Sequence, residues 1–205
     1  MRYHDETLEL TGSGVTMARI ISRLTPAPLV NFYVGAIMTY MSPIGLGPTL
    51  DSLSALLVVV IIMVVAPIVP IIHEVWKGRT DLDVSVQESR FKFLAFSLLC
   101  YIVAVAVFGY VNCLILQVLA VAYFNVTLGV LTANQRSKIS VHGAGVGGPG
   151  TALLMVYGWM ALPVVILWAL VIWSRVRLQQ HSFLQAAAGV LLGVLITWPT
   201  YLVLY

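Results

Sequence analysis

The topology of this chain depends on one apolar stretch, GAGVGGPGTALLMVYGWMALPVVILWALVIW, which covers residues 143–173. A continuous helix of that length would be about 46 Å long, which is too long for one upright membrane span and short for two. The GGPG sequence at residues 147–150 and the YGW sequence at residues 157–159 offer breaks. A turn near Gly158 would make the stretch a hairpin and leave its flanking polar segments on one side, whereas a single span would separate them.

The composition of the whole chain indicates a multi-pass membrane protein. Of its 205 residues, 60% are hydrophobic and 9% are charged, whereas soluble domains carry roughly 25% charged residues. Further apolar runs cover residues 29–48, 53–73, 93–131 and 182–205. The run 93–131 is long enough for two spans with a turn near residues 109–112. Pro67 and Pro70 predict a kink near the end of the run 53–73.

We therefore predict an all-α fold, with a single integral membrane domain over residues 1–205 and a polytopic bundle of six or seven transmembrane spans in residues 26–205. Residues 1–25 are predicted to form a polar N-terminus and a short helix. In that helix Arg19 and Arg23 share one face, while another face carries largely Val15, Ile20, Ile21 and Leu24. This pattern is typical of a helix at the membrane interface, and a simple lead-in to the first span fits it equally well.

Three polar joints connect the apolar runs, at residues 74–92, 133–142 and 174–181. If the stretch 143–173 is a hairpin, these joints share one face with all eleven basic residues: Arg2, Arg19, Arg23, Lys77, Arg79, Arg90, Lys92, Arg136, Lys138, Arg175 and Arg177. The positive-inside rule then predicts a cytoplasmic basic face in the cell membrane, with Tyr205 on the opposite side. Basic residues that serve a binding site weaken that inference.

The joints carry side chains suited to a phosphate ester. Together they would bring His142, His181, Arg90, Arg175, Lys138 and Ser140 to one membrane surface. Guanidinium groups bind phosphate oxygens bidentately, and a serine hydroxyl can donate to another oxygen. Two histidines can act as nucleophile and general acid if their pKa values differ.

The order and spacing of these residues resemble three motifs of the type 2 phosphatidic acid phosphatase family. Ser174-Arg175, five residues, His181, three residues and Gln185 is similar to the third motif, S-R-x5-H-x3-D. Ile139-Ser140-Val141-His142 is similar to the second motif, P-S-G-H, and Asp83-x6-Arg90-Phe91 is similar to the first, K-x6-R-P. The resemblance covers about residues 74–193. Two helices separate the second and third motifs in the family, which favours the hairpin.

The resemblance implies a membrane lipid phosphatase that needs no metal and no other cofactor and that passes through a phosphohistidine. His181 would be the nucleophile and His142 the acid that protonates the leaving oxygen, while Arg175, Arg90 and Ser140 would hold the phosphoryl group. Ser174 would support them from the third motif. We add Lys138 as a phosphate ligand because it lies two residues before Ser140.

The motifs also depart from the family pattern. Gln185 replaces the aspartate that accepts a hydrogen bond from the nucleophilic imidazole. Gln185 lies one helical turn after His181, so its amide oxygen could still accept that bond, but a neutral acceptor is roughly half as strong as a charged one. We therefore expect a slower nucleophile, or one assisted by Asp81, Asp83 or Glu88.

The partners predicted for this chain are the lipid bilayer and a phosphorylated membrane lipid, of the polyprenyl or phosphatidate type. The net charge of +3 requires no nucleic acid. The main alternative function is a non-hydrolytic binder or carrier of phosphorylated lipid. A Mg²⁺-dependent prenyltransferase, with Asp81 and Asp83 as a D-x-D metal site, is a third possibility. The glycine-rich run 143–150 is predicted to allow close helix packing, because it lacks the ending of a phosphate-binding P-loop. The sequence leaves the oligomeric state open.

Overall fold

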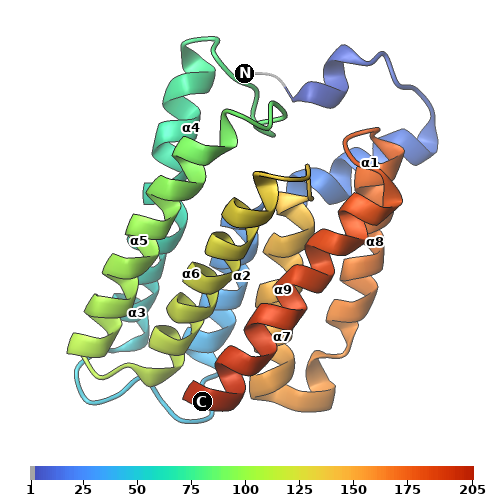
Figure 1. Ribbon diagram of the computed structural model, residues 1–205. Coiled ribbons are helices and arrows are strands. Elements are labelled where there is room, and N and C mark those ends of the chain that lie inside the picture. Colours follow the sequence, from blue (N-terminus) through green and yellow to red (C-terminus); the bar gives the residue numbers. More distant parts are fainter. Residues whose placement is uncertain (1–2) are drawn as a thin grey trace.

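The computed structural model describes residues 3–205, so that Arg2 lies outside the described residues, and no strand occurs within this range. Most of the chain forms a bundle of long helices (Figure 1). In chain order the elements are η1 (His4–Thr7), α1 (Ser13–Leu24), α2 (Ala27–Tyr40), α3 (Ser52–Val58), η2 (Val59–Val65), α4 (Ala66–Trp76), α5 (Arg90–Tyr110), α6 (Leu114–Asn134), α7 (Val141–Tyr157), η3 (Gly158–Ala161), α8 (Pro163–Arg177) and α9 (Phe183–Leu204).

The stretch 143–173 forms the helical hairpin that the sequence predicted. Helix α7 ends at Tyr157, and Gly158 adopts a φ of +59°, a conformation that glycine tolerates, before α8 returns along the bundle. The turn between α5 and α6 is likewise confirmed, with Asn112 at a φ of +56°. As a result, the joints α4–α5, α6–α7 and α8–α9 lie at one end of the bundle, which we call the polar end, and the C-terminus lies at the other (Figure 1).

Helices α7 and α9 form the most extensive helix contact in the described chain, and glycine makes this contact possible. A Cβ atom on Gly147 would lie 2.3 Å from the Val190 carbonyl oxygen, and one on Gly193 would lie 2.4 Å from the Gly148 nitrogen. Both clashes are with backbone atoms, which cannot move aside. The prediction that the glycine-rich run packs helices closely is therefore confirmed, and we call this contact the α7–α9 seam.

The first long helix is shorter than the apolar run 29–48 predicted. Helix α2 ends at Tyr40, and turns occupy the residues that follow. The sequence Ser42-Pro43 explains the early end, because a residue before proline disfavours helical geometry. Gly45 and Gly47 then adopt φ angles of +76° and +82°, which a continuing helix could not contain.

Within residues 3–205, four helical segments are long and apolar enough to cross a membrane: Ser52–Trp76, Arg90–Tyr110, Leu114–Asn134 and Phe183–Leu204. The remaining long helices are shorter, with 14 residues in α2, 17 in α7 and 15 in α8. Several predicted boundaries also shift. Helix α4 continues to Trp76, and Ser174 and Arg175 belong to the last turn of α8 rather than to the joint.

The prolines of the second apolar run lie in α4, immediately after a π-helical segment. Pro67 has no N–H to bond the Met63 carbonyl four residues earlier. That carbonyl accepts a hydrogen bond of 2.9 Å from the Asn31 side chain of α2. The irregular, π-helical part of this run therefore lies just before the prolines, at Val59–Val65.

Helix α1 packs against α8 at the polar end. Its buried face carries Val15, Ala18 and Ser22, whereas Ile20 and Leu24 are exposed. The face that packs against α8 therefore differs from the predicted apolar face, on which Ile20 and Leu24 remain exposed.

Candidate active site

The third motif is held in place by α1. The Ser174 hydroxyl, which is fully buried, donates a hydrogen bond of 2.7 Å to the Ala18 carbonyl oxygen. One helical turn further along α1, the Ser22 hydroxyl accepts a hydrogen bond of 2.6 Å from Arg175 Nη1. The Arg175 Nε–H is buried and has no hydrogen-bond partner among the described residues. Ser174 is therefore a link between helices, while Arg175 retains a donor that is free for a ligand.

Arg175 also forms a buried ion pair with Asp83 of the α4–α5 joint. The Nη1–Oδ1 distance is 3.2 Å, and both side chains are 3% exposed. Burial raises the pKa of Asp83, and the Arg175 charge opposes that shift. Asp83 thus offsets the positive charge of Arg175.

Arg90 ties the first joint to the second. Its side chain is buried, and its Nε donates to the Val84 carbonyl oxygen at 2.9 Å while Nη1 donates to the Ile139 carbonyl oxygen at 3.2 Å. A longer contact of 3.5 Å joins Nη1 to Asn134 Oδ1. These bonds leave Nη2 as the part of the guanidinium available to a phosphate.

The second motif begins helix α7. The Ser140 side chain caps the helix by accepting a hydrogen bond of 3.0 Å from the Gly143 N–H. The Ser140 N–H donates to the Gln185 carbonyl oxygen at 3.2 Å, which links the second motif to the third. His142 follows in the first turn of α7, within electrostatic range of Arg175, Arg90 and His181.

His181 lies in the short joint between α8 and α9. Its side chain is buried, and Nδ1 has no hydrogen-bond partner among the described residues. Burial lowers the pKa of His181 to about 3, and the charges of Arg175, Arg90 and Lys138 lower it in the same direction. The imidazole is therefore neutral at neutral pH, which is the form required of a nucleophile.

Gln185 has a different local role from the one predicted. Its Oε1 accepts a hydrogen bond of 3.0 Å from the Ser182 N–H, and the Ser182 hydroxyl accepts one of 3.2 Å from the Gln185 N–H. This is a capping box at the start of α9. Gln185 lies near enough to His181 to raise its pKa slightly, but its oxygen is engaged with the helix end and no hydrogen bond to Nδ1 forms.

The carboxylates proposed to assist His181 do not reach it either. Asp83 binds Arg175, and Asp81 accepts hydrogen bonds from the backbone and hydroxyl of Ser85. Lys138 lies at the partly exposed rim, where burial and then Arg90 lower its pKa, with opposing effects from Asp81 and Glu88. Lys138 thus adds positive charge near His181 without an ion pair of its own in the described chain.

Two residues of the site were missed by sequence reasoning. Ser22 accepts a hydrogen bond from Arg175. Asn134 of the second joint accepts one from Arg90 and donates one to the Gln87 carbonyl oxygen, so it bonds to two residues of the first joint. A signal for Ser22 exists, because it follows Val15 and Ala18 at helical spacing on the face that packs against α8.

A cavity of about 310 Å³ opens from the site. Its polar end is formed by Asp83, Arg90 and His142, and the remainder is lined mainly by apolar residues of α2, α4 and α5. A phosphate at the polar end would therefore lie beside an apolar chamber.

Asp81 and Asp83, considered above as a D-x-D metal site, face different partners: Asp81 bonds to Ser85 and Asp83 to Arg175. No group of three or more His, Cys, Asp or Glu side chains within the described residues is placed to bind a metal ion. No protein-family model matches this chain, and no curated protein or solved structure matches it.

Proposed function

We propose that this protein hydrolyses a lipid phosphate or diphosphate through a phosphohistidine at His181. One observation carries the proposal: Arg175 Nε and His181 Nδ1 are both buried and unpartnered within the described chain, beside His142 and Arg90. Buried polar groups without partners cost about 1–3 kcal/mol each. Such groups are retained where a ligand satisfies them, and the surrounding positive charge favours an anion.

The reaction divides between the two histidines. An imidazole nitrogen of neutral His181 bonds to phosphorus as the phosphorus–oxygen bond to the lipid breaks, and protonated His142 gives its proton to the leaving oxygen. In the second step His142 takes a proton from water, whose oxygen bonds to phosphorus as the phosphorus–nitrogen bond breaks. Inorganic phosphate leaves, which restores neutral His181, and His142 keeps the proton that it took from water, so both histidines return to their starting forms.

The charge of the substrate permits this division. Burial favours the neutral form of His181, and the charges of Arg175 and Arg90 add to that effect. The same two arginines act on His142. A phosphate dianion bound to Arg175 and Arg90 would offset those cations and allow one histidine to hold a proton. Protonation and substrate binding are thereby coupled.

A non-hydrolytic lipid binder is the second candidate, and a specific observation favours it. No carboxylate among the described residues bonds to His181, and Gln185 is engaged in a capping box. The positive charge that develops on the imidazole during attack therefore has no anionic partner. The same cluster of arginines would hold a phosphate without turnover if that charge raises the barrier too far.

We further propose that the bundle spans a cell membrane six or seven times. The outer surface of α9 supports this, because Leu191, Leu195 and Leu202 are 56%, 70% and 65% exposed, a pattern suited to lipid. The ten basic residues other than Arg2 lie at the polar end of the bundle (Figure 1), which the positive-inside rule places in the cytoplasm. A reporter fused after Tyr205 should therefore report the non-cytoplasmic side, and a cytoplasmic signal would contradict this orientation.

Phosphate release tests the proposed hydrolysis. The purified protein in detergent with EDTA would be given phosphatidate, a polyprenyl phosphate and a polyprenyl diphosphate. We expect release that survives EDTA and that His181→Ala abolishes. His73→Ala is the matched control, because His73 is exposed at the same end of the bundle. Bound lipid without release across the panel would instead favour the binder.

A further inference from the structure

The apolar part of the 310 Å³ cavity lies between helices that diverge. Helix α2 and helix α4 both contact the π segment Val59–Val65. Beyond that segment α4 packs chiefly against α5. Between α2 and this pair the cavity is walled by Pro67, Ile68 and Ile72 of α4 and by Phe93 of α5, with Pro26 and Pro28 at the start of α2 opposite. Ile72 is 42% exposed, so the α4 side of the cavity reaches the outer surface of the bundle.

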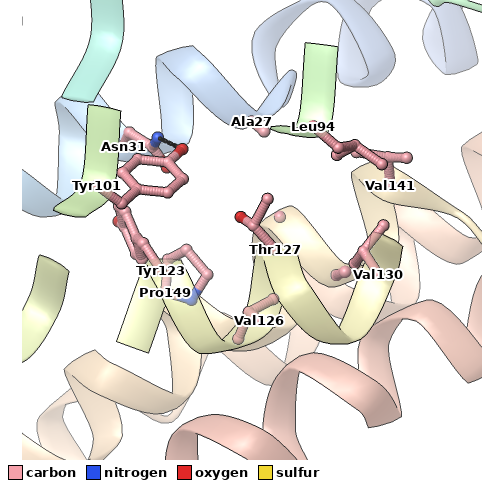
Figure 2. Close-up of a pocket in the computed structure, with 12 residues that line it drawn as sticks. Ala27, Asn31, Leu94, Tyr101, Tyr123, Val126, Thr127, Val130, Val141 and Pro149 are labelled. Carbon is pink, nitrogen blue, oxygen red and sulfur yellow. Dashed lines mark hydrogen bonds between the residues drawn. The ribbon is translucent and has the colours of Figure 1, made fainter. Parts of the chain in front are cut away.

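The far end of the cavity is closed by polar side chains that bond to one another. Asn31 Nδ2 donates to the Tyr101 hydroxyl at 3.0 Å and to the Met63 carbonyl oxygen at 2.9 Å. Figure 2 shows this pair beside Thr127, in a smaller cavity of about 50 Å³ that shares Tyr101 and Thr127 with the larger one. Tyr101 follows Arg90 by eleven residues of α5, which places it roughly 16 Å along the helix.

The wall next to the phosphate end is largely apolar. Pro26 and Pro28 have no N–H group, Leu82, Val84 and Ala27 have apolar side chains, and Tyr3 contributes one hydroxyl. The carbonyl oxygens of the two esters of a glycerolipid would lie at this level, where one hydroxyl serves at most one of them, so at least one carbonyl would be buried without a partner. A plain hydrocarbon chain has no such requirement.

Resting on the proposed phosphate site, we infer that this cavity holds the hydrocarbon chain nearest the phosphate and selects lipid phosphates that carry a single chain without ester groups. Its volume of about 310 Å³ lies at the lower end of the roughly 300–1,000 Å³ typical of ligand pockets. One chain fits that volume, and the chain leaves the bundle past Ile72. A two-chain phosphatidate would place both its second chain and its ester oxygens against the proline wall.

Photo-crosslinking tests this inference directly. Farnesyl phosphate with a diazirine on its chain would be irradiated with the full-length protein in nanodiscs, and labelled residues would be identified by mass spectrometry. We expect labels on α4 and α5 between Pro67 and Ile72 and between Phe93 and Ser97. Competition should require about tenfold more phosphatidate than farnesyl phosphate, equivalent to ~1.4 kcal/mol. Labels confined to α8 and α9, or equal competition by phosphatidate, would overturn the inference.

Neighbouring residues of α4 supply a matched pair of variants. Ile68 lines the cavity, whereas Val69 is 56% exposed and faces outward. Ile68→Trp should reduce labelling at least fivefold, and Val69→Trp should leave it unchanged at the same helix content, so equal losses in both would contradict the inference. Labelling in the absence of phosphate release would refute hydrolysis alone, and release with labels elsewhere would refute the cavity assignment alone.

Discussion

The bundle has two contrasting sides at its polar end. On one side the α7–α9 seam is closed by glycines whose Cβ atoms would strike backbone, and it carries His142 in the first turn of α7 and His181 just before α9. On the other side α2 separates from the packed pair of α4 and α5, which leaves the 310 Å³ cavity. The two histidines therefore lie on the closely packed side, where their positions are fixed. The lipid chain would occupy the side with the cavity.

The ion pair between Asp83 and Arg175 joins the two sides, and breaking it should have the largest effect. Arg175→Ala leaves Asp83 buried without a partner, so we expect a loss of about 3–5 kcal/mol in the free energy of unfolding and loss of phosphate release. The double variant Arg175→Ala/Asp83→Ala should regain most of that stability without activity. Thermal unfolding in detergent and a release assay measure the two quantities. Activity in the double variant would show that Arg175 does not hold the phosphate.

Opening the rigid side should have the next largest effect. Gly193→Val would place a Cβ 2.4 Å from the Gly148 nitrogen and 2.9 Å from the Ala144 carbonyl oxygen. We expect a destabilisation of about 1–3 kcal/mol or more, together with loss of activity as α7 and α9 separate. Gly14→Ala is the control, since its Cβ would lie 3.5 Å from the nearest atom, Arg177 Nε. An unchanged unfolding temperature in Gly193→Val would contradict the role of the seam.

The pH dependence of His181 reports on charges from both sides. Its pKa in the folded protein, about 3, lies below the ordinary value of about 6.5. The unfolded chain therefore binds the extra proton, so the stability from neutral His181 is present above about pH 6.5 and is lost as the pH falls toward 3. NMR of labelled histidine should find a neutral imidazole at pH 5.5 in the empty site and a raised pKa when phosphate ester binds. Titration near pH 6.5 in the empty site would contradict the buried cationic environment.

The smallest effect should come from restoring a carboxylate beside His181. Gln185→Asp should increase turnover by about fivefold, because a charged hydrogen-bond partner contributes ~1 kcal/mol more than a neutral one. Gln185→Asn is the matched control, since it has the length of aspartate without its charge. The kcat for a lipid phosphate would be compared among the three proteins. Equal values for the aspartate and asparagine variants would mean that the missing charge does not limit the rate.

The lengths of the apolar runs and the positions of glycine predicted the main turns and the closest helix contact. The hairpin at Gly158, the turn near Asn112 and the glycine seam all follow from how much apolar chain fits a helix and where glycine interrupts it. The end of α2 could also have been predicted, because Ser42-Pro43 and two nearby glycines precede the predicted limit at residue 48. The number of spans could not be predicted in this way, because α2, α7 and α8 contain 14, 17 and 15 residues, at or below the lower limit of the about 17–25 residues of a typical span.

The grouping of the site residues could be predicted, but their individual bonds could not. Motif order brought Arg90, His142, Arg175 and His181 to one end of the bundle. The capping box could have been predicted from Ser182-x-x-Gln185. The resemblance to the third motif instead predicted a bond from Gln185 to His181. The partnership of Arg175 with Ser22 and Asp83 depends on how α1 and the α4–α5 joint pack, which no local pattern specifies.

The most direct test of the central claim is to trap the phosphoenzyme. The purified protein would be mixed with excess lipid phosphate, quenched with alkali within the first turnover and digested, and the phosphorylated peptide would be identified by mass spectrometry. We expect an acid-labile phosphoryl group on His181 that is absent from His181→Ala and present in His73→Ala. Phosphate release without any label on His181, or a label on another residue, would contradict it.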